Sequence, residues 1–117
     1  MPLPPPPETA LSNTGKPVDV TPCVHRLRWM REHQPDLLDG AAQIVSVHDY
    51  LVRQLTGTAS ASWISADPFA IYDIHSKEWS RPILAHLGIP VSKLPVAHAP
   101  GTAIGRVNDI AAAATGL

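Results

Sequence analysis

Six histidines are the side chains of this sequence with the widest range of possible chemistry: His25, His33, His48, His75, His86 and His98. Histidine ligates metals and transfers protons near neutral pH, so a dense cluster would indicate a metal or catalytic centre. No His-Glu-x-x-His pattern occurs, and Cys23 has no cysteine partner. Two short pairs remain, His48 with Asp49 and His75 with Glu78. We expect surface or half-buried histidines, with a small hydrolase using His48 and Asp49 as a weaker alternative.

Other residue types with catalytic or binding chemistry also lack the required pattern. The Gly-x-Ser-x-Gly elbow of serine nucleophiles is absent, and Gly101–Gly105 has neither the spacing nor the lysine of a phosphate-binding loop. Cys23 falls on an apolar stripe and is expected to be a small core residue rather than a reactive thiolate. Trp29, Trp63 and Trp79 have the chemistry to stack on a sugar or base, but are expected to anchor a core or interface. These residues therefore predict no catalytic, cofactor-binding or metal site.

The elements that would position these residues are helices with a few short strands. Hydrophobic periodicity and helix-ending signals predict helices at residues 22–33, 48–55, 80–87 and 109–114. β-branched runs predict strands at residues 43–47 and 104–107. Residues 58–65 are expected to form a loop or edge strand, and residues 91–100 to be irregular because of their prolines.

The helix boundaries and buried faces are predicted as well. Thr21 is expected to cap the first helix. The apolar stripe of that helix consists of Cys23, Leu27 and Met30. Ser80 and Asp109 are expected to cap the last two helices, and Gly57 and Gly88 to end the second and third. The inward residues are then Leu51 and Leu55 in the second helix, and Ile83, Leu84 and Leu87 in the third.

Composition limits the class of protein. The 117 residues are 44% hydrophobic and 16% charged with a net charge of −1, which fits one domain with a modest core. This excludes a chain disordered throughout and a basic nucleic-acid-binding face, and no apolar run is long enough for a membrane span. A lone cysteine and no signal peptide are compatible with a cytoplasmic protein. Residues 1–15 are rich in proline and are expected to form an extended tail, either a disordered leader or a ligand for an SH3-like or WW-like groove.

Short sequence motifs, in a fixed order along residues 16–117, resemble those of a known protein family. These motifs lie within Arg26–Leu38, His48–Leu51, Leu55–Gly57, Tyr72–Ser80, Ile83–Pro90, Leu94–Pro95 and Gly101–Gly105. Together they resemble the middle of the N-terminal domain of FGGY-family carbohydrate kinases, which include xylulokinase and glycerol kinase. The resemblance implies a helix-rich α/β fold, part of an actin-like (RNase H-like) domain.

The resemblance also implies a parent kinase that transfers the γ-phosphoryl group of Mg-ATP to a sugar or polyol hydroxyl. The family's Asp-x-Gly-Thr phosphate loop and Gly-Gly-x-Asp catalytic stretch are both absent here. Where the family often has Asp-Tyr-Ser-x-Ala-Ser, residues 62–67 read Ser-Trp-Ile-Ser-Ala-Asp, and Thr21 replaces an aromatic of the glycerol-kinase branch. No catalytic, cofactor or metal residue is therefore carried over. ATP and Mg are implied for the full-length parent and not for this chain alone.

Two main hypotheses about function follow. The first is a fragment of a xylulokinase-like kinase, inactive by itself. The second is a non-catalytic interaction module derived from such a domain, which would use its proline-rich tail or exposed apolar surface. In either case we expect association with the remainder of a kinase or with itself, and no nucleic-acid or membrane partner.

Overall fold

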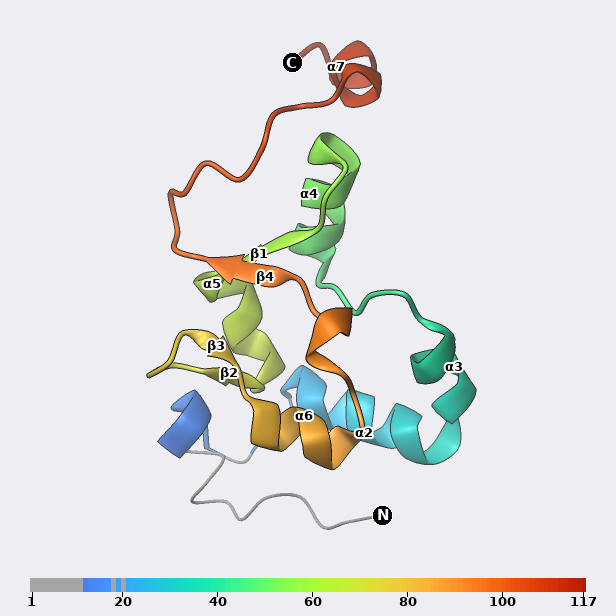
Figure 1. Cartoon of the computed structure of the whole chain (residues 1–117), viewed down its shortest axis with the longest axis vertical. Helices are drawn as coiled ribbons and strands as arrows, with labels where there is room; N and C mark the ends of the chain where they lie inside the picture. The colour runs from blue at the N-terminus through green and yellow to red at the C-terminus, as the bar shows by residue number, and fades with distance from the viewer. Residues whose placement is uncertain (1–11, 18, 20) are drawn as a thin grey trace.

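The structure is a computed structural model of the chain, and it describes residues 12–17, 19 and 21–117 (Figure 1). A helical turn at residues 12–14 comes first. The elements that follow are α2 (Cys23–His33), α3 (Pro35–Gly40), α4 (Val47–Thr56), β1 (Ser60–Ser62), α5 (Trp63–Ala66), η1 (Asp67–Phe69), β2 (Tyr72–Asp73), β3 (Glu78–Trp79), α6 (Arg81–Leu87), η2 (Val91–Lys93), β4 (Val96–His98) and α7 (Asp109–Thr115).

The hydrophobic core lies where α2, α6 and the β2–β3 hairpin meet. Trp79 belongs to this core, and its ring packs edge-to-face on both Phe69 and Tyr72, with ring centroids 5.5 and 5.7 Å away. The Trp79 indole N–H donates to the Pro95 carbonyl at 2.7 Å, so the polar atom of this buried side chain is satisfied. The other buried apolar residues of the cluster are Leu27, Leu38, Ala61, Ala66, Ile71, Ile83, Leu84, Leu87, Ile89 and Leu94.

Two small sheets complete the fold. Strands β1 and β4 pair in parallel, with Ser60 opposite Val96 and Ser62 opposite His98. Parallel pairing requires a long crossover, and here the intervening chain supplies α5, the β2–β3 hairpin and α6. The antiparallel hairpin pairs Tyr72 with Trp79 across a turn at residues 74–77.

The four predicted helices are present, at slightly shifted boundaries. Gly57 and Gly88 adopt the left-handed conformation just past α4 and α6, as the helix-ending signals predicted. The expected buried face of α6, Ile83, Leu84 and Leu87, is also confirmed.

Two of the predicted helix caps are misplaced by one residue, and a third forms no cap hydrogen bond. Pro22 rather than Thr21 occupies the cap position of α2. At α7 the cap is Asn108, whose side chain accepts a hydrogen bond from the Ala111 N–H, and Asp109 is the first helical residue. Ser80 does precede α6, but its side chain makes no capping hydrogen bond.

Both predicted strands are wrong. Residues 43–46 are irregular because no strand among the described residues pairs with them: Ser46, although extended in backbone, caps α4, and the Ile44 N–H donates to the carbonyl of Lys93 in η2. Residues 104–107 form an exposed connection with no strand partner in the part of the chain that the structure describes. A strand does occur at Val96–His98, within the stretch expected to be irregular, because Pro95 and Pro100 flank that segment without interrupting it.

The N-terminal prediction of an extended, solvated tail fails at residues 12–14, and residues 1–11 lie outside the described part of the chain. The Asn13 carbonyl accepts a hydrogen bond from the Ile74 N–H at 2.9 Å, and Lys16 forms an ion pair with Asp67 at 2.6 Å. Thr14 is buried. This short segment therefore packs on the β2–β3 hairpin.

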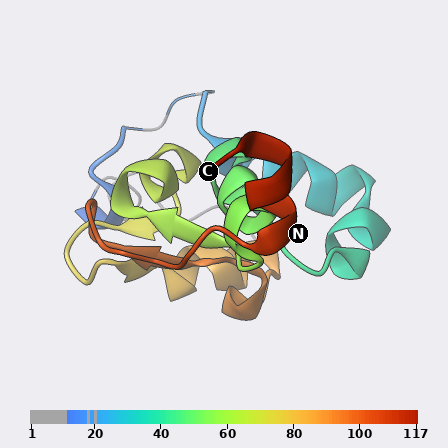
Figure 2. The same cartoon turned by 90° about the horizontal axis from the view of Figure 1, so that it is seen from above.

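The C-terminal helix α7 stands away from the core at the end of a long connection and lies against α4, as both overall views show (Figures 1 and 2). Asn108 fixes this position: its N–H donates to the Leu55 carbonyl at 2.8 Å, and its side-chain amide donates to the Gln54 carbonyl at 3.0 Å. No residue of α7 is fully buried.

Candidate functional site

The most buried charged side chain that the structure describes is Asp49, with an exposed fraction of 0%. It is the third residue of α4, and its Oδ2 accepts a hydrogen bond from the Ser46 N–H at 3.2 Å. The Ser65 hydroxyl donates to Oδ1 at 3.0 Å, and the His48 Nδ1 lies 3.0 Å from the same oxygen. A buried carboxylate needs such partners, because burial without them costs several kcal/mol, to order of magnitude.

Two reciprocal capping boxes create this arrangement, and we call Ser46, Asp49, Ser62 and Ser65 the capping network. In α4 the Ser46 hydroxyl accepts from the Asp49 N–H, and the Ser46 N–H donates to the Asp49 carboxylate. In α5, Ser62 and Ser65 repeat the pattern at 3.0 and 2.9 Å. The bond from Ser65 to Asp49 joins the first turns of the two helices. The network satisfies helix-terminal N–H groups and positions α4 against α5.

The geometry of His48, Asp49 and Ser65 does not support the hydrolase alternative. In a nucleophilic relay the imidazole lies between the carboxylate and the hydroxyl, so that it takes the hydroxyl proton. Here the imidazole and the hydroxyl both bind Asp49 Oδ1, and Ser65 donates its proton to the carboxylate. The side chain of His48 is 53% exposed. The arrangement therefore orders helix ends and does not activate Ser65.

The histidines are dispersed over the surface. His25, His33, His48 and His75 are exposed, and His86 and His98 are half-buried. His33 stacks on Trp29 with ring centroids 4.6 Å apart, and His75 Nε2 lies 2.9 Å from the Ser12 carbonyl. Among the residues described, no three His, Cys, Asp or Glu side chains lie together as a metal site would require. His75 and Glu78 form no ion pair in this described part.

Cys23 is a half-buried residue packed against the core, which agrees with its predicted position. Burial raises the pKa of its thiol, and the positive charge of Arg26 offsets only part of that rise. A raised pKa keeps the thiol protonated at neutral pH, whereas the thiolate is the nucleophile.

The three tryptophans differ in environment. Trp79 is in the core, Trp63 is half-buried with the Lys77 ammonium 5.2 Å from its ring centroid, and Trp29 is 51% exposed. They lie on different elements and form no common stacking platform.

The hairpin carries two perturbed titratable groups. Hydrogen bonds from the Ser76 and His75 N–H groups, at 3.1 and 2.8 Å, lower the pKa of Asp73 although its slight burial opposes them. Burial raises the pKa of Tyr72, and the negative charge of Glu78 adds to the rise. The buried Tyr72 hydroxyl has no hydrogen-bond partner among the described residues. The Asp73 carboxylate thus stabilises the turn of the hairpin.

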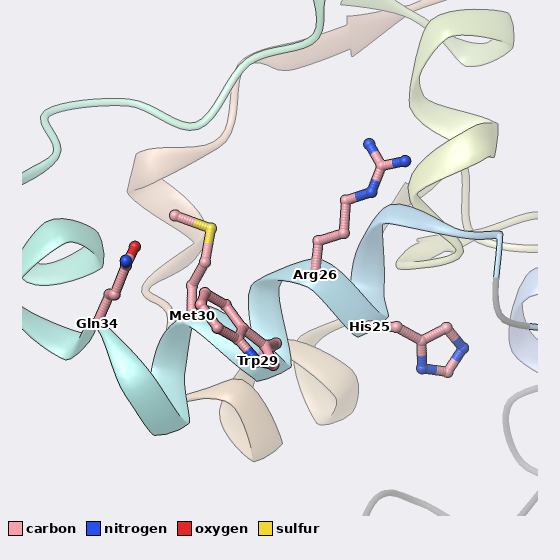
Figure 3. A pocket seen from close by; sticks show the side chains of 5 residues that line it. All are labelled: His25, Arg26, Trp29, Met30 and Gln34. Carbon is pink, nitrogen blue, oxygen red and sulfur yellow. The ribbon is translucent and has the colours of Figure 1, made fainter.

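A surface depression on α2 is a further candidate in the part of the chain that the structure describes (Figure 3). Its lining residues, His25, Arg26, Trp29, Met30 and Gln34, all come from this helix and its C-terminal end. The close-up shows His25 and Arg26 pointing in different directions and away from Met30. Ligand pockets need convergent side chains from several elements, so this surface offers no enclosed site.

The three serines of the capping network, Ser46, Ser62 and Ser65, are absent from the sequence-based candidates. Their signal was present in the sequence: Ser46-x-x-Asp49 and Ser62-x-x-Ser65 each place two side chains with helix-capping capacity three residues apart, directly before a helix. No helix in the described part of the chain has the length and apolar character to cross a membrane.

Comparisons with known proteins point to one family. The sequence profile described as "FGGY family of carbohydrate kinases, N-terminal domain" matches residues 7–117. The probable L-xylulose kinase of Pasteurella multocida (strain Pm70) is 33% identical over 106 residues, which cover 89% of this chain and 21% of that protein. The autoinducer-2 kinase of Enterobacter sp. (strain 638) is 30% identical over 92 residues, covering 79% of this chain and 17% of that protein.

Solved structures give the same answer for the fold. The xylulose kinase from Rhodospirillum rubrum superposes with a TM-score of 0.87 and 30% identity, over 96% of this chain and 23% of that one. The gluconate kinase from Lactobacillus acidophilus also reaches 0.87, at 19% identity, over 94% of this chain and 22% of that one. The chain thus spans about a fifth of the length of these relatives. The predicted helix-rich α/β fold of a sugar-kinase N-terminal domain is confirmed, and the chain belongs to the FGGY family of carbohydrate kinases.

Proposed function

We propose that this chain serves as part of the N-terminal domain of an ATP-dependent kinase that phosphorylates a hydroxyl of a sugar or polyol. The observation that carries the proposal is the structural likeness to the R. rubrum xylulose kinase, which extends over 96% of this chain. The substrate class we favour is a ketose, on the printed names of the relatives: xylulose kinase, probable L-xylulose kinase and rhamnulokinase. One unpaired cysteine fits a cytoplasmic location.

The residues of this chain do not themselves fit Mg-ATP. Phosphoryl transfer needs a loop that cradles phosphates, carboxylates that hold the metal and a carboxylate that accepts the hydroxyl proton. The sequence contains neither Asp-x-Gly-Thr nor Gly-Gly-x-Asp, and the described residues include no acidic cluster that holds a cation. We therefore assign no residue to ATP or Mg²⁺ and propose that other parts of a kinase bind them; the Plasmodium falciparum glycerol kinase was solved with ADP.

The role that remains for this segment is positional. The buried Asp49 and the half-buried Ser65 tie two helices together, and the core residues fix α2 and α6 against the hairpin. We infer that the 117-residue chain by itself transfers no phosphate.

A segment replacement tests the proposal. Residues 7–117 of this chain replace the matching segment of the R. rubrum xylulose kinase, and ADP release is measured with Mg-ATP and xylulose. We expect the chimera to phosphorylate xylulose and the isolated chain to release no ADP with xylulose, rhamnulose, gluconate or glycerol. The unaltered kinase is the positive control. A well-folded chimera without activity would contradict the positional role, and phosphate transfer by the isolated chain would contradict its inactivity.

The alternative, a non-catalytic interaction module, is favoured by the apolar side chains at the surface. Val47, Ile64, Val96 and Ile110 are each more than two-thirds exposed. The oligomeric state of the chain, measured by size-exclusion chromatography with light scattering, distinguishes the interaction module from the kinase segment. A discrete, folded dimer favours the module, whereas a monomer or a heterogeneous aggregate favours a segment that packs within a larger domain.

A further inference from the structure

The hydrogen bonds that hold helix α7 to α4 come from one residue, Asn108. Its backbone N–H donates to the Leu55 carbonyl at 2.8 Å, and its side-chain amide donates to the Gln54 carbonyl at 3.0 Å. Among the described residues, no other hydrogen bond joins the two helices. No residue of α7 is fully buried, and Ile110 is 85% exposed. The attachment of α7 therefore depends on a small contact centred on Asn108.

Asn108 bonds the ends of two helices at once. Its side-chain oxygen accepts from the Ala111 N–H at 2.9 Å, which caps the N-terminal end of α7. Its two N–H groups satisfy carbonyls in the last turn of α4, which have no partner within their own helix. The partial positive charge at the start of α7 thus lies against the partial negative charge at the end of α4, which is a favourable arrangement.

The side chain at position 108 must both accept and donate a hydrogen bond. The amide of Asn108 does so, because its oxygen caps α7 while its NH₂ group reaches the Gln54 carbonyl. Aspartate and serine cap helices about as well as asparagine. A carboxylate has no proton to donate, however, and a serine hydroxyl is too short to reach both partners. Asn108→Asp and Asn108→Ser therefore preserve the cap of α7 and remove the side-chain bond to α4.

The connection that precedes α7, residues 99–107, leaves the helix free to move. Residues 100–107 are all exposed, and the backbone hydrogen bond within this described stretch is a local turn from the Thr102 N–H to the Ala99 carbonyl. Both overall views show α7 away from the core at the end of this connection (Figures 1 and 2). A helix of seven residues is too short to be stable in water by itself. Release from α4 should therefore also unfold α7.

We propose that α7 leaves and rejoins α4 as a unit while the core stays folded, and that Asn108 sets the balance between the docked and the released state. In the docked state α7 covers the C-terminal end of α4. In the released state the carbonyls of Gln54 and Leu55 are open to water or to another partner. The last helix is thus a removable cover for the end of α4, and this inference is independent of the proposed kinase function.

Amide hydrogen exchange of the 117-residue chain, followed residue by residue by NMR, tests this proposal. The Asn108 N–H reports docking because it donates to Leu55, and the Ala112 N–H reports the helix because it donates to the Asn108 carbonyl. The Ile89 N–H donates to the Leu84 carbonyl and reports the core. We expect Asn108 and Ala112 to share one protection factor, at least about a hundredfold below that of Ile89.

Substitutions at position 108 then test the role of the side-chain amide. Asn108→Asp and Asn108→Ser should each lower the protection factor of Ala112 about tenfold, while that of Ile89 keeps its value. Asp109→Asn, the reverse change at the adjacent exposed residue, is the matched control and should alter the Ala112 value less than about threefold.

Four results would overturn the proposal. Equal protection of Ala112 and Ile89 in the native chain would mean that α7 opens only when the core unfolds, and no protection of Ala112 would mean that α7 does not dock. A loss at Ile89 in the Asn108 variants would make α7 part of the core unit. An effect of Asn108→Asp that Asn108→Ser does not share would identify charge repulsion, and not the lost amide donor, as its cause.

Discussion

Asp49→Ala is expected to lower the free energy of unfolding more than any other single carboxylate removal in the described part of the chain. The substitution deletes the acceptor for the Ser46 N–H and the Ser65 hydroxyl, and both donors lie in a partly buried site. Loss of half a capping box costs about 1 kcal/mol, and loss of a hydrogen bond to a charged acceptor costs about 2 kcal/mol. The variant also no longer bears the cost of desolvating a buried carboxylate, which offsets part of this loss. We therefore expect the free energy of unfolding to fall by about 2 kcal/mol.

Urea unfolding followed by far-UV circular dichroism measures this loss. For a domain of this size a slope of about 1.5 kcal/mol/M converts 2 kcal/mol into a midpoint lower by more than 1 M. Where the variant is unfolded in water, the same titration is run in trimethylamine N-oxide for every variant, because this osmolyte favours the compact state.

Two control variants isolate the effect of burial. Asp109→Ala removes an exposed carboxylate in the first turn of α7, and His48→Ala removes the half-exposed partner of Asp49. Each is expected to change the free energy of unfolding by less than about 1 kcal/mol. Asp49→Asn keeps one carbonyl acceptor and should fall between these controls and Asp49→Ala. A loss for Asp49→Ala no larger than that for Asp109→Ala would refute the structural role of the capping network.

Two further predictions concern the β2–β3 hairpin. Tyr72→Phe should raise the free energy of unfolding by about 1 kcal/mol, because it removes a buried hydroxyl that has no partner among the described residues; a clear loss in the same urea titration would show that the hydroxyl is satisfied. The lowered pKa of Asp73 means that its carboxylate contributes stability above its unfolded-state pKa of about 3.9, and that this contribution is lost as pH falls through the folded-state value. The difference in stability between the native chain and Asp73→Asn should therefore be constant near neutral pH and shrink below about pH 4, and a difference that stays the same down to pH 2.5 would contradict the role of the Ser76 and His75 N–H groups.

The helices could be predicted from the sequence because their signals are local. Gly57 and Gly88 end helices through their own backbone freedom, and the stripe Ile83, Leu84 and Leu87 marks a buried face within seven residues. The resemblance to FGGY kinases was predictable for a similar reason, since it rests on phrases along the chain. Neither inference required knowledge of which segments meet in space.

The strands could not be predicted because pairing is a property of two segments. Residues 43–47 have strand-forming side chains, but Ser46 caps α4 and none of the described strands pairs with this segment. Val96–His98 has weaker strand character and is nevertheless paired, because α6 and η2 return the chain to β1. β-propensity reflects the surroundings of a residue, and only tertiary structure supplies them.

The orientation of α4 shows how far a periodic pattern can be interpreted. The expectation that Leu51 faces inward is wrong, while Leu55 is half-buried. Apolar periodicity defines a face of a helix, but it does not say whether that face meets the core of the same segment or another part of a larger protein. The tertiary hydrogen bond from Ser65 to Asp49 carries the missing information: it holds Asp49 inward, so Val47 and Leu51, two positions before and after it, face outward.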